Sequence, residues 1–209
     1  MSNGLSIVHT RNFTKETNMN KQIRQGVFET NSSSTHTISI AKSNEFSRYV
    51  PTNTVIFFSS GQFGWENEVY HSSKNKAAYL WTGIVTSGIF DAEAIEKIKN
   101  SITRLFERYD CMVGFQPYKV GKYETCDREY TVFADEYGYI DHSDELSEFL
   151  RAMFPDNEGT IDEALFLNYL FNPYSYIETS NDNSDEECDG YYPSDYNIHG
   201  ERIEFYKGN

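Results

Sequence analysis

Two kinds of hydrophobic pattern predict the strands of this chain. Residues 36–40 (His-Thr-Ile-Ser-Ile) alternate apolar and polar side chains, as a strand with one buried face does. Residues 54–58 are a continuous β-branched and aromatic run, which is typical of a central strand covered on both faces. The remaining predicted strands lie at residues 22–29, 112–115, 129–133, 175–178 and 202–206.

Apolar residues spaced three and four apart predict the helices. The clearest helix opens at Asp91 and carries its apolar stripe from Ile95 to Tyr109. An earlier helix begins at Ser72 and Ser73 and ends near Gly88, since glycine suits a helix end. A short helix is also predicted over residues 43–49, closed off by a proline at position 51.

Two more helices are predicted in the last third of the chain. One starts at Ser143. The other starts at Thr160-Ile-Asp-Glu163, a capping box in which the threonine and glutamate side chains would satisfy unpaired amides, and it runs to Phe171. An asparagine and a proline then stop that helix.

The order of these elements predicts the fold class. Strands and helices are mixed without a regular strand–helix–strand alternation, so we expect an α+β fold, with a mixed or antiparallel sheet packed against about four helices. Residues 19–209 are expected to form a single domain. Residues 1–18 are polar and aperiodic and predict a flexible N-terminal extension. Residues 181–190 are too acidic and too poor in apolar groups to pack, which predicts a mobile loop.

Charge is distributed unevenly along the chain. The net charge is −14, and residues 131–209 alone hold 19 Asp and Glu against 3 Lys and Arg. Phosphates would be repelled there, so we expect no direct binding of nucleic acid by this third. The charge instead suits a basic protein partner or an imitation of nucleic acid, although a plain solvated acidic face is the commoner case.

Composition also narrows the location of the protein. The longest apolar runs, such as residues 55–58, are far too short to span a membrane, and the N-terminus lacks the apolar block of a signal peptide. The three cysteines are widely spaced and form no C-x-x-C motif. We therefore expect free thiols in a reducing cytoplasm.

The stretch over residues 28–36, Phe-Glu-Thr-Asn-Ser-Ser-Ser-Thr-His, has the densest run of small polar side chains. Hydroxyls and loop amides of this kind can form a nest for an anion such as phosphate. The predicted ligand-binding residues here are Glu29, Asn31, Ser32, Ser33 and Ser34, with His36 as a candidate base. No P-loop or G-x-S-x-G motif is present, and the hydroxyls would equally suit the capping of local backbone groups.

Two further polar motifs are candidate parts of the same site. Asp141 and His142 are adjacent and could bind a metal or run acid–base chemistry, or they could lie at the start of a helix as capping residues. Trp65 and Glu66 follow a flexible turn, where the indole could stack on a base or sugar, anchor a partner, or fill the edge of the core.

The acidic loop supplies the predicted partner-binding residues. Its spacing resembles the opening of a calcium loop, but the glycine needed at the sixth position is replaced by Glu186, so an EF-hand is rejected. The carboxylates expected to contact a partner are Asp182, Asp185, Glu186, Glu187 and Asp189.

Residues 24–36, Arg-Gln-Gly-Val-Phe-Glu-Thr-Asn-Ser-Ser-Ser-Thr-His, resemble the N-terminal signature of a family of uncharacterised phage and prophage proteins. Residues 63–66, 139–142 and 176–183 are similar to the same family. The resemblance implies a viral origin and a bacterial cytoplasm. It implies no catalytic role.

Two functions are predicted from these observations. The first is a phage-encoded accessory protein that binds and antagonises a host protein, such as a nucleic-acid-handling defence factor, through its acidic last third. The alternative is a hydrolase-like enzyme that binds a nucleotide or phosphate. In this enzyme, His36 or His142 would be the base, and Asp141 and Asp182 would orient that base or bind a divalent metal ion. The serines would hold the phosphate. A third, weaker interpretation is a virion component.

Overall fold

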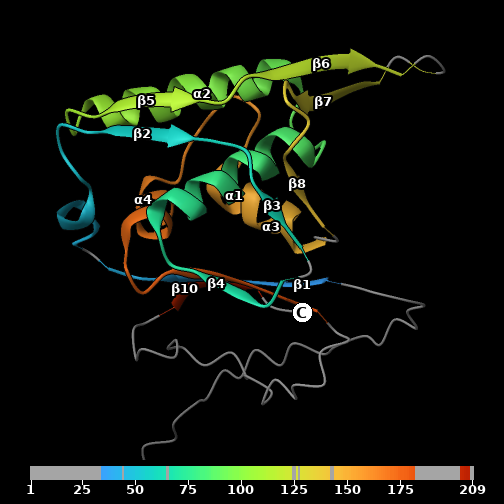
Figure 1. Ribbon diagram of the computed structural model, residues 1–209. Coiled ribbons are helices and arrows are strands. Elements are labelled where there is room, and N and C mark those ends of the chain that lie inside the picture. Colours follow the sequence, from blue (N-terminus) through green and yellow to red (C-terminus); the bar gives the residue numbers. More distant parts are fainter. Residues whose placement is uncertain are drawn as a thin grey trace, which may run out of the picture. The chain divides into compact units, whose positions relative to one another are not determined.

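The computed structural model describes residues 34–43, 45–64, 66–123, 126, 128–141, 144–181 and 203–207. All of them belong to one unit of the chain, residues 31–209. The described residues form an α+β fold, as the element order predicts (Figure 1). The predicted strand at 22–29, the N-terminal extension and the acidic loop lie outside the described residues.

The largest sheet has four strands in the order β10-β1-β9-β4, and every neighbouring pair in it is antiparallel. Its strands are β1 (Ser34–Ala41), β4 (Glu68–Tyr70), β9 (Tyr176–Asn181) and β10 (Ile203–Lys207). The strand predicted over residues 36–40 is confirmed, but its burial on one face only is wrong, because Ser39 on the opposite face is buried together with His36, Ile38 and Ile40. We call this sheet the main sheet.

Helix α1 (Ser73–Thr86) is the central element of the fold. Figure 1 shows it between the main sheet and a second layer formed by α2, β2 and β5. Its residues from Lys76 to Val85 are all buried, so other parts of the protein surround this helix on all sides. The predicted cap is confirmed, since the Ser72 side chain accepts a hydrogen bond from the Asn75 amide at 3.2 Å.

The other helices are α2 (Ala92–Glu107), α3 (Asp144–Met153) and α4 (Glu163–Phe171). Asp91 caps α2 as predicted, accepting a hydrogen bond from the Ala94 amide at 2.8 Å. The predicted short helix near Pro51 is present as a 3-10 turn, η1 (Phe46–Tyr49).

The capping box predicted for α4 is wrong. The cap is Asp162, whose carboxylate accepts a hydrogen bond from the Leu165 amide at 3.1 Å. The Thr160 hydroxyl instead donates to the Asp156 carboxylate at 2.6 Å. Because Asp156 holds the threonine in the preceding turn, the helix begins two residues later than the motif predicts.

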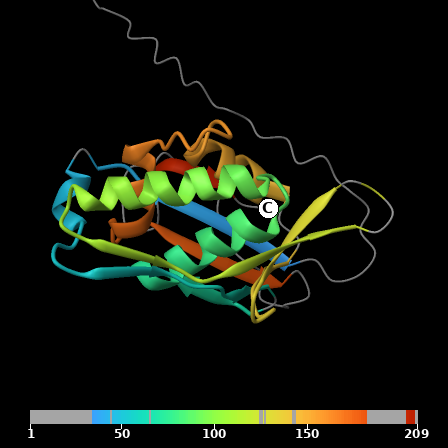
Figure 2. The ribbon, with the colours of Figure 1, turned by 90° about the horizontal axis from the view of Figure 1, so that it is seen from above.

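Three two-stranded sheets complete the architecture of the described residues. Strands β2 (Val55–Phe58) and β5 (Met112–Phe115) are parallel, as are β3 (Gln62–Phe63) and β8 (Tyr139–Ile140), whereas β6 (Tyr118–Lys122) and β7 (Glu129–Phe133) are antiparallel. Figure 2 shows β2 and β5 running beside α2. The prediction of a strand at β2 is confirmed, but its central position is wrong. It pairs only with β5 in the described part, and its outward side chains are exposed.

Aromatic side chains supply much of the bulk of the core, alongside a larger number of aliphatic residues. Many of its largest fully buried members are rings: Trp81, Tyr79, Tyr169, Phe58, Phe106, Phe133, Phe149, Phe154 and Phe166. Their bulk offsets the modest apolar content of the sequence. In the part of the chain that the structure describes, no helix is both long and apolar enough to cross a bilayer.

Candidate functional site

The most unusual buried polar group is the imidazole of His36, near the start of β1. The residue is only 2% exposed, although it ends the polar stretch singled out in the sequence. Its Nδ1 atom lies 3.1 Å from the hydroxyl of Tyr79 on α1, and the direction of that hydrogen bond depends on the tautomer. Its Nε2 atom is buried and has no hydrogen-bond partner among the residues that the structure describes. A buried polar atom in this state costs free energy, so it marks a candidate site.

The electrostatic surroundings keep this imidazole neutral at pH 7. Burial lowers the pKa of His36 from 6.5 to about 4, and the carboxylate of Asp141 acts in the opposite direction. Burial prevails because the charged form would lose its hydration. A neutral imidazole has one nitrogen that donates a hydrogen bond and one that accepts, and the tautomer decides which is which.

Thr179 on β9 stands opposite His36 in the sheet register. Its buried hydroxyl donates to the backbone carbonyl of Glu66 at 2.6 Å. This bond ties the exposed Glu66 turn to the same end of the main sheet. Burial, followed by a hydrogen bond with Glu68, raises the pKa of the nearby Tyr70 phenol to about 12.

Asp141 comes to this end through the β3–β8 pair. Its backbone amide donates to the carbonyl of Phe63 at 2.9 Å. Gly64 allows the close approach, since a β-carbon at Gly64 would lie 3.2 Å from the Asp141 β-carbon. Asp141 is half-buried there and interacts electrostatically with His36. We call His36, Tyr79, Asp141, Thr179 and Glu66 the His36 cluster.

The fold therefore brings several of the predicted site residues together. Ser34, the first residue of β1, pairs with Asn181, the last residue of β9, only two residues along the strands from His36 and Thr179. The His36 cluster thus takes residues from five places along the chain. Asn181, after which the sequence becomes acidic, lies at the same end of the main sheet.

Other predicted site residues cannot be placed. The side chain of Ser34 is not described. The following residues lie outside the described part and stay predictions: Glu29, Asn31, Ser32, Ser33, Trp65, His142, Asp182, Asp185, Glu186, Glu187 and Asp189. Among the residues that are described, no three His, Cys, Asp or Glu side chains are grouped to hold a metal ion.

Sequence reasoning missed Tyr79 and Thr179, the polar partners in the cluster. Tyr79 lies within a helical run of apolar residues, where a tyrosine is indistinguishable from core packing. Thr179 is one of many hydroxyl residues in the C-terminal region. Only the register of β1 against β9 identifies it.

A second buried polar group, Lys76 on α1, was also missed. Its Nζ donates to the backbone carbonyls of Asn172 at 3.1 Å and Ser175 at 3.0 Å, just beyond the end of α4. Burial lowers the pKa of Lys76 to about 7. The ammonium group satisfies carbonyls at a helix C-terminus, which suits the helix dipole. Its evident role is to join α1 to the connection between α4 and β9.

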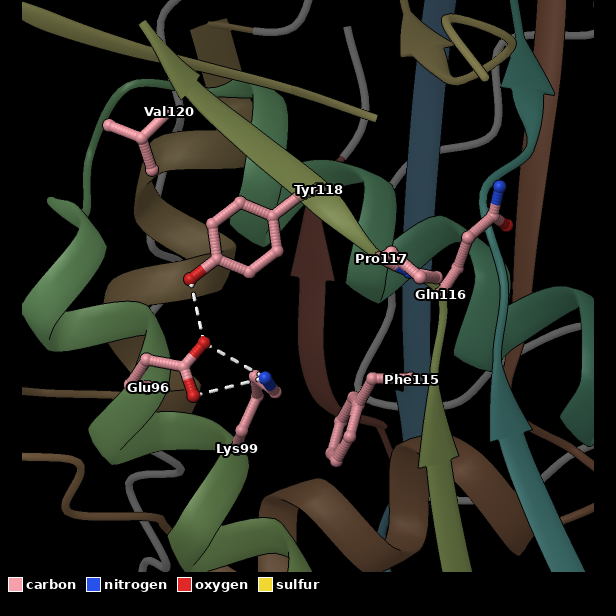
Figure 3. Close-up of a pocket in the computed structure, with 7 residues that line it drawn as sticks. All are labelled: Glu96, Lys99, Phe115, Gln116, Pro117, Tyr118 and Val120. Carbon is pink, nitrogen blue, oxygen red and sulfur yellow. Dashed lines mark hydrogen bonds and ion pairs between the residues drawn. The ribbon is translucent and has the colours of Figure 1, made fainter. Parts of the chain in front are cut away.

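A hollow of about 420 Å³ lies in another layer, between α2 and the β5–β6 segment. Figure 3 shows the Tyr118 hydroxyl and the Lys99 ammonium both directed at the Glu96 carboxylate, at 2.9 Å and 2.8 Å. Burial acts to raise the pKa of Glu96, but the bonds from Lys99 and Tyr118 outweigh it and hold the pKa below its usual value. Lys99 also lies 5.8 Å from the ring centres of Phe115 and Tyr118. The charges of this hollow are therefore paired within the chain.

The sequence and fold were compared with known proteins. No protein-family model, curated protein or solved structure matches this chain. The resemblance of residues 24–36 to phage and prophage proteins therefore stays a prediction.

Proposed function

We propose that this protein is a binding protein which engages a basic surface of another protein through the carboxylates of its C-terminal third. In the same proposal it is encoded by a phage, and its target is a host protein in the bacterial cytoplasm, such as a defence nuclease with a basic nucleic-acid channel. The observation that carries the proposal is charge. Residues 131–181 hold 11 Asp and Glu but a single basic residue, Arg151.

Cations from elsewhere in the chain offset part of this charge. Glu158 pairs with Lys97 of α2 at 2.9 Å, and Glu163 pairs with Arg108, the residue that caps the end of α2, at 2.5 Å. Asp135 and Glu136 are exposed in the turn that follows β7. The excess of carboxylates is a source of negative potential that would attract a basic protein and speed its encounter.

The His36 end of the main sheet is the best location for the contact. Glu66 and Glu68 are exposed there, and Asp141 is half-buried beside them. The five carboxylates predicted to bind a partner follow directly after Asn181 in sequence. A partner that binds at this end would meet charges from three separate segments of the chain.

The test is affinity capture from a bacterial lysate. The intact chain is compared with a variant in which five carboxylates are neutralised: Asp182→Asn, Asp185→Asn, Glu186→Gln, Glu187→Gln and Asp189→Asn. A matched control neutralises five exposed carboxylates elsewhere: Glu45→Gln, Glu93→Gln, Glu107→Gln, Asp110→Asn and Glu129→Gln. We expect the intact chain and the control to retain the same basic protein and the first variant to lose it.

Salt provides the second readout. Retention should fall steeply between 50 and 500 mM NaCl, because the Debye length shrinks from roughly 14 Å to roughly 4 Å. The proposed mechanism would be contradicted if retention of the basic protein did not fall as the NaCl concentration rises. It would also be contradicted if the five-carboxylate variant still retained that protein.

A second candidate function rests on the unpaired Nε2 atom of His36. The neutral imidazole, the Tyr79 hydroxyl and the Asp141 carboxylate are groups that a hydrolase-like, phosphate-binding enzyme would use. Its test is hydrolysis of p-nitrophenyl phosphate and ATP with Mg²⁺, by the intact chain and by His36→Gln. Turnover that disappears in His36→Gln would favour the enzyme, and equal background rates in both proteins would reject it.

A further inference from the structure

Within the described part of the chain, the parallel pair β2–β5 is covered on one face only. Ile56 and Phe58 of β2 and Phe115 of β5 pack inward, where the Phe115 ring lies 5.2 Å from the Phe58 ring and 5.0 Å from the Trp81 ring of α1. Parallel strands are almost always covered on both faces. The uninterrupted apolar sequence of β2, Val-Ile-Phe-Phe, is typical of such a doubly covered strand.

The outward face of this pair is apolar and bare. Val55 is 57% exposed, Phe57 is 52% exposed and Met112 is 68% exposed. Val55 stands directly opposite Met112 in the register, and Phe57 stands opposite Gly114. The Phe57 ring lies over that glycine, where an added β-carbon would be 2.7 Å from the ring. These four residues form one continuous surface, which we call the β2–β5 face.

The segments that carry this face contain no charge at all. Residues 49–64 and 111–118 include no Asp, Glu, Lys or Arg, in a chain that is 24% charged with a net charge of −14. Depletion of charge is the compositional mark of an interface core, and cores of homodimers are the most apolar. The basic partner proposed above would find no carboxylate on these segments, so this face suits a different occupant.

We propose that the β2–β5 face binds the same face of a second copy of this chain, forming a two-fold symmetric dimer. A two-fold contact places identical patches together, so the surface must complement itself. An uncharged apolar face does so without bringing like charges into contact, whereas acidic surfaces of two copies would repel. Burial of both apolar faces drives the association. This inference does not depend on the partner proposed for the acidic residues.

The test is analytical ultracentrifugation of the intact chain from 1 to 200 µM. We expect a concentration-dependent dimer. Two independent variants, Phe57→Glu and Met112→Glu, should each raise the dimer dissociation constant at least about a hundredfold, because each buries a charge in an apolar contact. The control is Val69→Glu, which introduces the same charge at a side chain that is 49% exposed on the main sheet. It should dimerise like the unaltered chain.

Hydrogen exchange of the unaltered chain supplies a readout that does not depend on any variant. Peptides that span residues 54–60 and 110–118 should exchange more slowly at 200 µM than at 1 µM. A chain that stays monomeric at 200 µM overturns the proposal, and so does a dimer that both β2–β5 variants leave intact. If the chain stays monomeric, the β2–β5 face is assigned instead to an apolar surface of a different protein.

Discussion

The imidazole of His36 and the phenol of Tyr79 meet in the protein interior with 3.1 Å between Nδ1 and the hydroxyl oxygen, although 43 residues separate them in sequence. The contact joins β1 to α1, the central helix. The other imidazole nitrogen is buried and has no hydrogen-bond partner in the described part of the chain. One polar pair thus links the most distinctive sequence motif to the core.

The first prediction concerns acid stability. Burial lowers the pKa of His36 from 6.5 to about 4. Below pH 6.5 the imidazole therefore becomes protonated in the unfolded chain, while in the folded chain it stays largely neutral down to about pH 4. The free energy of unfolding should therefore fall by about 3 kcal/mol from this group between pH 7 and pH 4. Urea titrations of the intact chain and of His36→Gln over this range measure it. Equal losses in both proteins would contradict the assignment.

The second prediction concerns alkaline pH. Burial lowers the pKa of Lys76 to about 7, so between pH 7 and pH 9 the folded chain releases a proton that the unfolded chain keeps. The free energy of unfolding should rise by about 2 kcal/mol from this group over that interval. Urea titrations at pH 7 and pH 9 should show the rise in the intact chain.

Lys76→Met supplies the control for that measurement. It should lack the alkaline rise. It should also be less stable than the intact chain at pH 9, because the carbonyls of Asn172 and Ser175 lose their donor. If the free energy of unfolding still rises between pH 7 and pH 9 in Lys76→Met, a group other than Lys76 causes the rise.

The third prediction separates the two capping schemes for α4. Asp162→Ala should lower the free energy of unfolding by about 1 kcal/mol, because the Leu165 amide loses its acceptor. Thr160→Ala should cost less, since the Thr160 hydroxyl is bonded to Asp156 in an exposed turn. Thermal and urea unfolding of the two variants show which substitution lowers the free energy of unfolding more. A larger loss in Thr160→Ala than in Asp162→Ala would support the capping box instead.

The fourth prediction tests packing at Gly138. A β-carbon there would lie 2.4 Å from the buried ring of Phe133 and 2.8 Å from the Ser60 β-carbon, so Gly138→Ala should cost about 1–3 kcal/mol. Gly121→Ala is the matched control. Its added β-carbon would meet only the ring tip of the exposed Tyr130, which can move aside. Similar losses in both variants would contradict the packing at Gly138.

Much of the candidate site could be anticipated as a set of polar residues, but not as an arrangement. The sequence singles out His36, Glu66 and Asp141 because a base and carboxylates stand within polar motifs. It does not single out Tyr79 or Thr179, whose importance comes from long-range register and from the packing of α1 against the main sheet. It also suggests an accessible base, whereas the fold buries His36 and lowers its pKa.

The sequence by itself determined the elements whose causes are local. The strand pattern of β1, the apolar stripe of α2 and the caps at Ser72 and Asp91 depend on residues that are close together in sequence, so they can be recognised without a fold. Tertiary structure alone decided which strands pair. It left Phe57 exposed in a two-stranded sheet and brought Asp141 to His36. Strand pairing joins residues far apart in sequence, and the apolar pattern of one strand does not specify its neighbour.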